Sequence, residues 1–341
     1  MQRIIFTSQA SSAELCLNEM NKAELKFKFT GWLESGIGII ETDMSFIEFS
    51  DAVKSCKLIF LRHICPVDQV IGIDNIVNMY GKKNDVVYKI VKEAQQSLRD
   101  AKSFSVQVRR SSSAEYDALE LQRSIADGLK ESGFILSVNN PDYIISVYIF
   151  KDVVYEGTSK AEDNLSSWPG GMRRYAMLPE TVSRAEFKLL EALEYLGIDV
   201  SGGHALDLGA APGGWSRVLA ERGCKVDAVD PAELAESVVR NPAVTHYKCL
   251  AQEFAEHNNK QYDVIVNDMK MDVVQSVGII MEFSDYLNND GIVIMTFKLM
   301  KKNRMQAINK GLEMLNEKYT CVMVKQLFNN RSEITVVLKK Q

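Results

Sequence analysis

The chain has 341 residues, 46% hydrophobic and 25% charged, which is enough to fold as two or three domains with buried cores. Its net charge of −5 argues against a protein that holds nucleic acid by bulk electrostatics, so an RNA partner would need local basic patches. The six cysteines form no CxxC pair, and neither a signal peptide nor an apolar run of membrane-spanning length is evident. We therefore expect a cytoplasmic protein with reduced thiols, no bound metal and no membrane association.

The first ~65 residues mix alternating segments, at 3–7 and 38–41, with helical ones around 12–20 and 49–54. A helix is predicted over 84–100, a strand over 104–108 and a second helix over 119–129 that stops at Gly133. A hairpin follows, with strands over 143–150 and 153–155, the second closed by Gly157.

Residues 158–179 are polar and rich in Gly and Pro, which marks a domain boundary. Beyond it a helix at 183–196 is followed by strands at 204–208, 226–229, 264–267 and 291–296, separated by helical or loop stretches. This alternation predicts an α/β domain with a doubly wound, mostly parallel sheet. We predict a small α+β domain over 1–65, a second over 66–165, a linker over 166–180 and the α/β domain over 181–341.

Residues 207–216, with the sequence DLGAAPGGWS, end a predicted strand and open a predicted helix, which is where an open α/β sheet binds ligands. Gly209, Gly213 and Gly214 have GxxxGG spacing, which differs from the GxGxxG of a dinucleotide site. No Gly-Lys-Ser/Thr follows as in a P-loop, and Pro212 lacks an N–H that a pyrophosphate could use.

Asp230 ends the next predicted strand, about 20 residues after Gly209, where a carboxylate can accept both hydroxyls of a ribose. A nucleoside cofactor without phosphates fits this pattern best. A simple strand-to-helix turn with glycines for packing would explain Gly209 alone, but not the whole arrangement.

The segment DLGAAPGGWS resembles motif I of the FtsJ/RrmJ class of S-adenosylmethionine-dependent ribose methyltransferases. These enzymes use a Lys-Asp-Lys-Glu tetrad, and each member has a match here in its expected setting. The matches are Lys188 on the helix before motif I, Asp268 and Lys298 after predicted strands, and Glu333 in the segment 331–335. Each alone is a weak signal, because a Lys or Glu at a strand end is usually a surface residue, but the four in order are a strong one.

This resemblance implies a Rossmann-like methyltransferase domain with S-adenosyl-L-methionine as its cofactor. The residues implied to bind the cofactor are Asp207, Gly209, Ala210, Ala211, Pro212, Gly213, Gly214, Trp215, Asp230, Gln252 and Asp268. Where the class commonly has an acidic residue near the adenine amine, the segment 248–253 offers Leu250. Gln252 or a backbone carbonyl is then the alternative acceptor.

Within the class the similarity is greatest to the RlmM type, which methylates a cytidine ribose in 23S ribosomal RNA. The similarity rests on residues 325–336 and 298–302. That family places an RNA-binding THUMP domain ahead of the catalytic domain, and residues 140–157 are similar to the end of one. The resemblance implies a structured RNA partner, either 23S rRNA or a pre-ribosomal particle.

Two basic groups are candidates for RNA contacts. The first is Arg173 with Arg174, and the second is the run Lys298, Lys301, Lys302 and Arg304. On charge pattern alone, a solvated face is the commoner explanation of either group.

Methyl transfer to a ribose hydroxyl is an in-line displacement that requires alignment and the removal of a proton. We expect Lys298 to be the general base, with its pKa lowered by burial and by the like charge of Lys188. Asp268 would position Lys298, and Lys188 with Glu333 would complete the site.

Two alternatives remain open. A noncatalytic RNA-binding or ribosome-assembly protein that keeps the fold is disfavoured by the complete tetrad. A small-molecule methyltransferase is disfavoured by the basic residues and by the THUMP-like segment.

Overall fold

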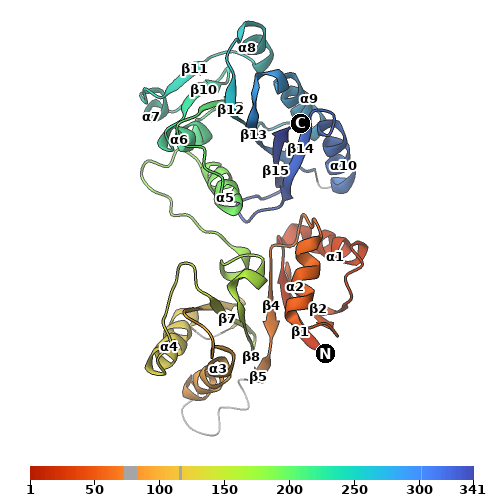
Figure 1. The fold of residues 1–341 in the computed structure, drawn as a ribbon, viewed down its shortest axis with the longest axis vertical. Helices are drawn as coiled ribbons and strands as arrows, with labels where there is room; N and C mark the ends of the chain where they lie inside the picture. The colour runs from red at the N-terminus through yellow and green to blue at the C-terminus, as the bar shows by residue number, and fades with distance from the viewer. Residues whose placement is uncertain (73–82, 115–116, 301) are drawn as a thin grey trace. The chain divides into compact units, whose positions relative to one another are not determined.

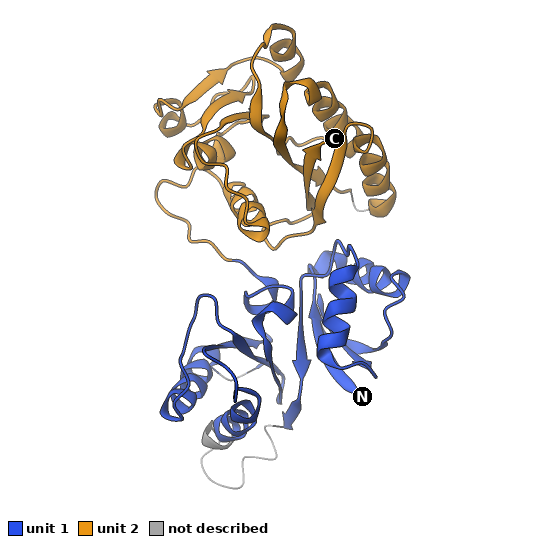
Figure 2. Ribbon diagram, viewed as in Figure 1, with its two compact units in different colours: residues 1–173 blue, residues 174–341 orange. Residues whose placement is uncertain are grey.

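The computed structural model describes residues 1–72, 83–114, 117–300 and 302–341. It divides into two compact units, unit 1 over Met1–Arg173 and unit 2 over Arg174–Gln341 (Figure 2). The division falls inside the predicted linker. Lys301, one of the basic candidates, lies outside the described residues. None of the helices that the structure describes combines the length and the apolar composition needed to cross a membrane.

Unit 1 begins with a four-stranded antiparallel sheet in the order β2-β3-β1-β4 (Figure 1). Its elements are β1 (Gln2–Thr7), α1 (Ala13–Lys22), β2 (Lys28–Glu34), β3 (Ile37–Thr42), α2 (Phe46–Ser55) and β4 (His63–Val67). A β-α-β-β-α-β succession in this order is the ferredoxin-like arrangement. The boundary predicted between residues 65 and 66 falls inside β4, so the first sheet extends to Val67.

The second sheet of unit 1 has the order β5-β8-β7-β6, with β6 parallel to β7. Its elements are β5 (Gln69–Gly72), α3 (Lys83–Ser97), β6 (Phe104–Arg110), α4 (Ala118–Glu131), β7 (Tyr143–Phe150) and β8 (Val153–Lys160). Helices α3 and α4 pack against each other and share an apolar core with the sheet. The predicted helices and hairpin of this region are therefore present.

β8 continues to Lys160, beyond the stop that the sequence predicts at Gly157. A Cβ atom on Gly157 would lie 2.2 Å from the carbonyl oxygen of Pro66 in β4. Glycine at this position therefore allows a close approach of two backbones and does not end the strand.

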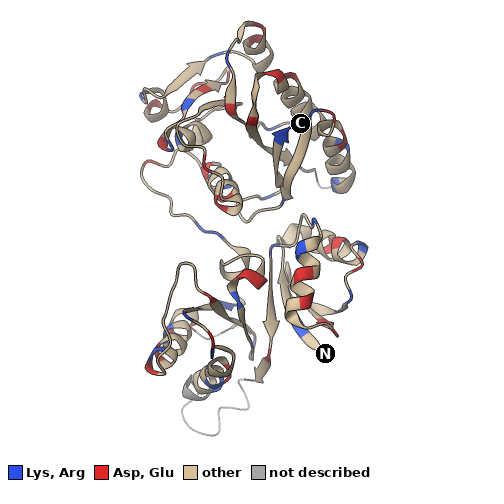
Figure 3. Cartoon of the chain, in the orientation of Figure 1, with Lys and Arg blue, Asp and Glu red and all other residues tan. Residues whose placement is uncertain are grey.

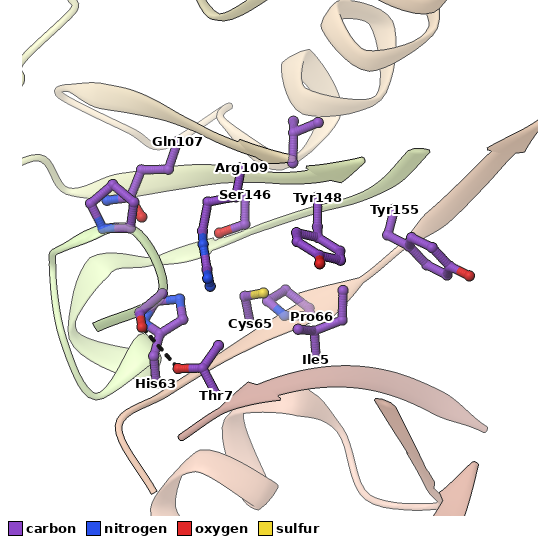
Figure 4. Close-up of a pocket in the computed structure, with 13 residues that line it drawn as sticks. Ile5, Thr7, His63, Cys65, Pro66, Gln107, Arg109, Ser146, Tyr148 and Tyr155 are labelled. Atoms are coloured by element: carbon purple, nitrogen blue, oxygen red, sulfur yellow. Dashed lines mark hydrogen bonds between the residues drawn. The ribbon is translucent and has the colours of Figure 1, made fainter. Parts of the chain in front are cut away.

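A small cavity of about 20 Å³ lies between the two sheets of unit 1 (Figure 4). Arg109 extends from β6 toward β4, which carries His63 and Cys65 (Figure 4). The Thr7 hydroxyl donates to the carbonyl of Gly170 at 2.8 Å. Gly170 lies in a short 3-10 turn (Pro169–Gly171), so the first half of the predicted linker packs within unit 1.

Unit 2 contains a seven-stranded sheet in the order β11-β10-β9-β12-β13-β15-β14. The strands are β9 (His204–Leu208), β10 (Lys225–Val229), β11 (Val244–Tyr247), β12 (Tyr262–Asn267), β13 (Leu287–Lys298), β14 (Tyr319–Lys325) and β15 (Glu333–Lys340). The helices are α5 (Glu186–Leu196), α6 (Gly214–Glu221), α7 (Glu236–Val239), α8 (Ala251–His257), α9 (Val273–Glu282) and α10 (Arg304–Leu315).

The first five strands of this sheet are parallel, and β15 and β14 add an antiparallel edge. The predicted Rossmann-like, doubly wound sheet is confirmed. The chain order reverses between β9 and β12, and ligands bind such sheets at the carboxyl ends of the strands at this reversal.

Candidate functional site

The loop between β9 and α6 holds the glycines of motif I. Gly209 has φ +73°, and a Cβ there would lie 2.1 Å from the side chain of Met269. Gly213 has φ +105°, and a Cβ there would crowd Val238 at 2.9 Å. Both positions therefore require glycine, because their left-handed backbone and the tight space exclude a side chain.

The N–H groups of this loop are already engaged. Those of Gly209 and Ala210 both donate to the carbonyl of Val229, and that of Ala211 donates to the Asp230 carboxylate at 3.0 Å. Pro212 has no N–H to offer. Because a phosphate needs several free N–H donors, the geometry favours a ligand without phosphates at this loop, as the spacing of the glycines predicts.

Two aspartates accept hydrogen bonds at this loop and at the helix that follows it. Asp207 is buried and accepts a 2.6 Å hydrogen bond from the Ser216 hydroxyl, and its burial raises the pKa of its carboxyl to about 7. Asp230 accepts from Ala211 and, at 2.8 Å, from the N–H of Ala232. Each oxygen of Asp230 thus retains a lone pair for a further donor.

The other residues proposed to bind the cofactor differ in their burial. Trp215 is buried and donates its indole N–H to the carbonyl of Ala185 at 2.7 Å. A Cβ on Gly214 would meet Ser183 and Glu186, so Gly214 faces the start of α5. Pro212 and Gln252 are exposed, and Ala210 is buried.

The four tetrad residues come together at the carboxyl end of the sheet. Lys188 lies on α5, Asp268 follows β12, and Lys298 ends β13 directly opposite Glu333, the first residue of β15. Lys188 Nζ lies 2.9 Å from Asp268 Oδ2 and 2.6 Å from Glu333 Oε1. Lys298 Nζ contacts Asp268 Oδ1 and lies 3.4 Å from Glu333 Oε2.

The tetrad is a nearly buried cluster of two ammonium groups and two carboxylates. Burial opposes the charged form of Lys188, but Asp268 and Glu333 outweigh it and raise the pKa of Lys188. Burial likewise opposes ionisation of Asp268, yet Lys298 and Lys188 hold the pKa of that carboxyl below its usual value. The sequence suggests that the like charge of Lys188 lies near Lys298. In the structure the carboxylates of Asp268 and Glu333 also lie beside Lys298.

Thr296, which was not among the residues expected from the sequence, also belongs to this cluster. Its hydroxyl donates to Asp268 Oδ1 at 2.6 Å, and the residue is fully buried. Thr296 is two residues before Lys298 on β13, and residues so spaced share one face of a strand. That spacing was the available signal for it.

A cleft of about 600 Å³ opens beside Lys188 and Glu333. Its lining also includes Arg174, Arg184 and Arg331, all of which are exposed residues. Its aromatic residues are Tyr175, Phe187 and Phe328, and the first two rings stack at 5.4 Å.

The basic candidates are thus divided. Arg174 lines the cleft, whereas the guanidinium of Arg173 lies 4.0 Å above the ring of Trp168 in unit 1. Lys298 belongs to the tetrad, Lys302 is exposed, and Arg304 begins α10. Basic and acidic residues are interspersed along the ribbon of each unit, as the net charge leads one to expect (Figure 3).

Comparison with known proteins assigns two parts of the chain. Residues 181–331 match the model of the FtsJ-like methyltransferases, and residues 83–155 match the THUMP domain. The ribosomal RNA large subunit methyltransferase M of Azoarcus sp. (strain BH72) is 31% identical over 191 residues, which cover 52% of this chain and 51% of that protein. The protein of the same name from Halorhodospira halophila is 32% identical over 51% of both chains.

The chain therefore spans about half the length of these curated relatives. The uncharacterized protein MJ1257 of Methanocaldococcus jannaschii is 26% identical over 94% of both chains. The crystal structure of TrmN from Thermus thermophilus covers 100% of both chains with 15% identity and a TM-score of 0.41. The family matches confirm the two resemblances found in the sequence: residues 83–155 are a THUMP domain, and residues 181–331 belong to the FtsJ-like methyltransferases.

Proposed function

We propose that this chain is a cytoplasmic S-adenosylmethionine-dependent methyltransferase that acts on a ribose 2′-hydroxyl of large-subunit ribosomal RNA. The observation that carries the proposal is the assembled cluster of Lys188, Asp268, Lys298 and Glu333. It lies at the same sheet edge as the motif I loop, because β9 and β12 are neighbours. The resemblance to the RlmM type suggests a cytidine of 23S rRNA as the target, in free RNA or in a pre-ribosomal particle.

The residues around the motif I loop fit S-adenosylmethionine. Gly209 and Gly213 let Met269 and Val238 pack closely against the loop and so fix its backbone, and the engaged N–H groups suit a nucleoside without phosphates. The remaining lone pairs of Asp230 can accept the cofactor's ribose hydroxyls. When bound, the cofactor supplies an electrophilic methyl group.

The tetrad would align the acceptor and remove its proton. We assign the general base to Lys298, whose side chain is 20% exposed and is the most accessible of the four. Asp268 receives hydrogen bonds from Lys188 and Thr296 as well as from Lys298, which fixes its carboxylate and therefore the position of the Lys298 Nζ. Lys188 and Glu333 would hold the acceptor ribose.

The cleft beside Lys188 supports RNA as the substrate. Its arginines can contact phosphates, and its aromatic rings can stack against an unpaired base. In a chain of net charge −5, such a local concentration of guanidinium groups is what an RNA contact requires. The THUMP domain in unit 1 would supply further RNA contacts.

The test is Lys298→Ala, assayed for transfer of labelled methyl groups to ribosomal RNA. We expect turnover to fall by about 10²- to 10⁴-fold, because a general base acts mainly on the transition state. Cofactor binding, measured by titration calorimetry, and RNA binding should stay near the wild-type values. The exposed neighbour Lys302, changed to alanine, is the matched control and should retain turnover.

Near-normal turnover in Lys298→Ala would remove this residue as the base. A wild-type protein that binds RNA without transferring methyl groups would instead favour a noncatalytic role. Mapping 2′-O-methyl sites in ribosomal RNA from cells with and without the gene would identify the target nucleotide.

A further inference from the structure

Glu191 is a buried carboxylate that the proposed reaction does not use. It lies on α5, three residues after Lys188, and is only 6% exposed. Residues three apart on a helix are neighbours on one face, so Glu191 and Lys188 are presented together by the same turn of α5.

Glu191 binds the loop that joins β14 to β15. The backbone N–H of Phe328 donates to Glu191 Oε1 at 2.9 Å, and that of Asn329 donates to Oε2 at 2.8 Å. The side-chain amide of Asn329 adds a third hydrogen bond, to Oε2 at 2.7 Å. Both carboxylate oxygens are therefore engaged by one short stretch of backbone.

This loop leads directly into Glu333 and is braced internally. The Asn330 side-chain oxygen accepts from the N–H of Leu327 at 2.8 Å and from the Thr335 hydroxyl at 3.1 Å. The Gln326 amide donates to the carbonyl of Glu333 at 3.3 Å. Because these hydrogen bonds restrain the loop, holding it at Phe328 and Asn329 also fixes the position of Glu333.

We propose that Glu191 is a positioning residue for the proposed methyl transfer. It holds the β14–β15 loop, which precedes Glu333, against α5, which carries Lys188. Glu191 thereby fixes the positions of both side chains in the 2.6 Å contact between Lys188 and Glu333. The same hydrogen bonds set the wall of the cleft that Phe328 and Asn329 form. This inference rests on the proposed function for its catalytic consequence, whereas the link between loop and helix can be tested without it.

A charged carboxylate is a costly group to bury, and water or a neutral amide could satisfy a single loop N–H. Only a carboxylate offers two equivalent acceptor oxygens to two successive N–H groups. A glutamate at position 191 is therefore explained by the need to hold the β14–β15 loop in one defined position.

The test compares Glu191→Gln with Glu191→Asp and with Glu194→Gln, an exposed carboxylate on the same helix. Glutamine keeps the size of the side chain but turns one acceptor into a donor that faces N–H groups. We expect Glu191→Gln to lower kcat by roughly 10- to 100-fold, because small misplacements of catalytic groups have effects of this size. The KM for the cofactor should change little, and Glu194→Gln should behave as wild type.

Hydrogen exchange gives the second readout, which does not depend on activity. In Glu191→Gln the amides of residues 326–333 should exchange at least about tenfold faster, while other strands of unit 2 keep their protection. Glu191→Asp retains the carboxylate and should give an intermediate result in both measurements. It also keeps the proposal testable should the glutamine variant fail to fold.

Faster exchange with an unchanged kcat would overturn the positioning role, and unchanged exchange would overturn the link between the loop and α5. Methyl transfer by the wild-type protein is measured first. Its absence would count against the proposed function, and the exchange experiment would still decide whether Glu191 fixes the loop.

Discussion

The tetrad of unit 2 and Glu156 of unit 1 are buried ionisable groups with different kinds of partner. In unit 2 the tetrad pairs two ammonium groups with two carboxylates, and the fully buried Glu186 contacts the guanidinium of Arg217. In unit 1, Glu156 is 1% exposed, and the side-chain partners that the structure describes for it, Gln69 and Thr158, are neutral. The carboxylates of the tetrad thus have cationic partners, whereas the described side-chain partners of Glu156 are neutral donors.

The pKa values follow from this difference. Burial raises the pKa of Glu156 to about 7, and burial together with the charge of Arg109 lowers the pKa of His63 to about 3. Both groups are therefore favoured in their neutral forms inside unit 1. Asp207 behaves in unit 2 as Glu156 does: burial raises its pKa to about 7, and its side-chain partner, Ser216, is neutral. The nature of the partner, and not the unit, decides which form is stable.

The largest expected effect comes from breaking the paired cluster. Lys188→Met should destabilise unit 2 by about 3–5 kcal/mol, because it leaves two buried carboxylates with one cation between them. Urea unfolding followed by peptide-level hydrogen exchange would measure the loss for each unit separately. The loss should persist well into the acid range, since the pKa of Asp268 is lowered. Lys188→Arg keeps the charge and is the control, and a loss below about 1 kcal/mol in Lys188→Met would contradict the pairing.

The converse change, in unit 1, should stabilise. An acid whose pKa is raised on folding loses stability as pH rises from its unfolded pKa, near 4.5, to its folded pKa, near 7. Glu156→Gln should therefore leave stability unchanged near pH 4 and raise it by up to about 3 kcal/mol at pH 8. A gain that is the same at both pH values would show that ionisation of Glu156 is not its cause.

Comparison of these regions also shows what the sequence could predict. The parallel sheet of unit 2 was predictable, because each buried strand is a short apolar run between helical stretches. Strand β4 was not, because it contains Pro66, which normally argues against a strand. Among the strands that the structure describes, β4 is at the edge of its sheet beside β1, so the missing N–H is tolerated there.

The tetrad could be proposed from the sequence because its four members occur in the order, and beside the predicted elements, that the FtsJ/RrmJ resemblance implies. Glu191 could not, since its partners, Phe328 and Asn329, are 137 and 138 residues away along the chain. Neither could the environment of Lys298, because the meeting of two carboxylates with two lysines depends on strand register. The local sequence pattern predicts helices and strands, whereas the pairing of buried charges depends on how those elements pack in the folded protein.

His63 should make the stability of unit 1 depend on pH in the direction opposite to Glu156. A histidine whose pKa is lowered on folding contributes stability that is complete above pH 6.5 and is lost as pH falls toward about 3. Between pH 4.5 and 6.5 its slope, about 1.4 kcal/mol per pH unit, has the opposite sign to that of Glu156 and nearly cancels it.

In the Glu156→Gln variant the slope from His63 should therefore become visible in unit 1 over that pH window. His204→Gln changes an exposed histidine of unit 2 and should leave the slope in place. A flat profile in the Glu156→Gln variant would mean that His63 becomes protonated without unfolding unit 1.

The smallest expected effects serve as a calibration, because they should not differ between the units. Asp117 accepts hydrogen bonds from two N–H groups at the start of α4 in unit 1, and Asp272 does the same at the start of α9 in unit 2. Both capping residues are exposed, so each carboxylate stays in contact with solvent. Asp117→Ala and Asp272→Ala should each cost about 1 kcal/mol in their own unit, measured by the same urea titration. A much larger loss of stability in one unit would mean that this unit responds more strongly to any substitution. The different effects of Lys188→Met and Glu156→Gln could then not be assigned to buried charge.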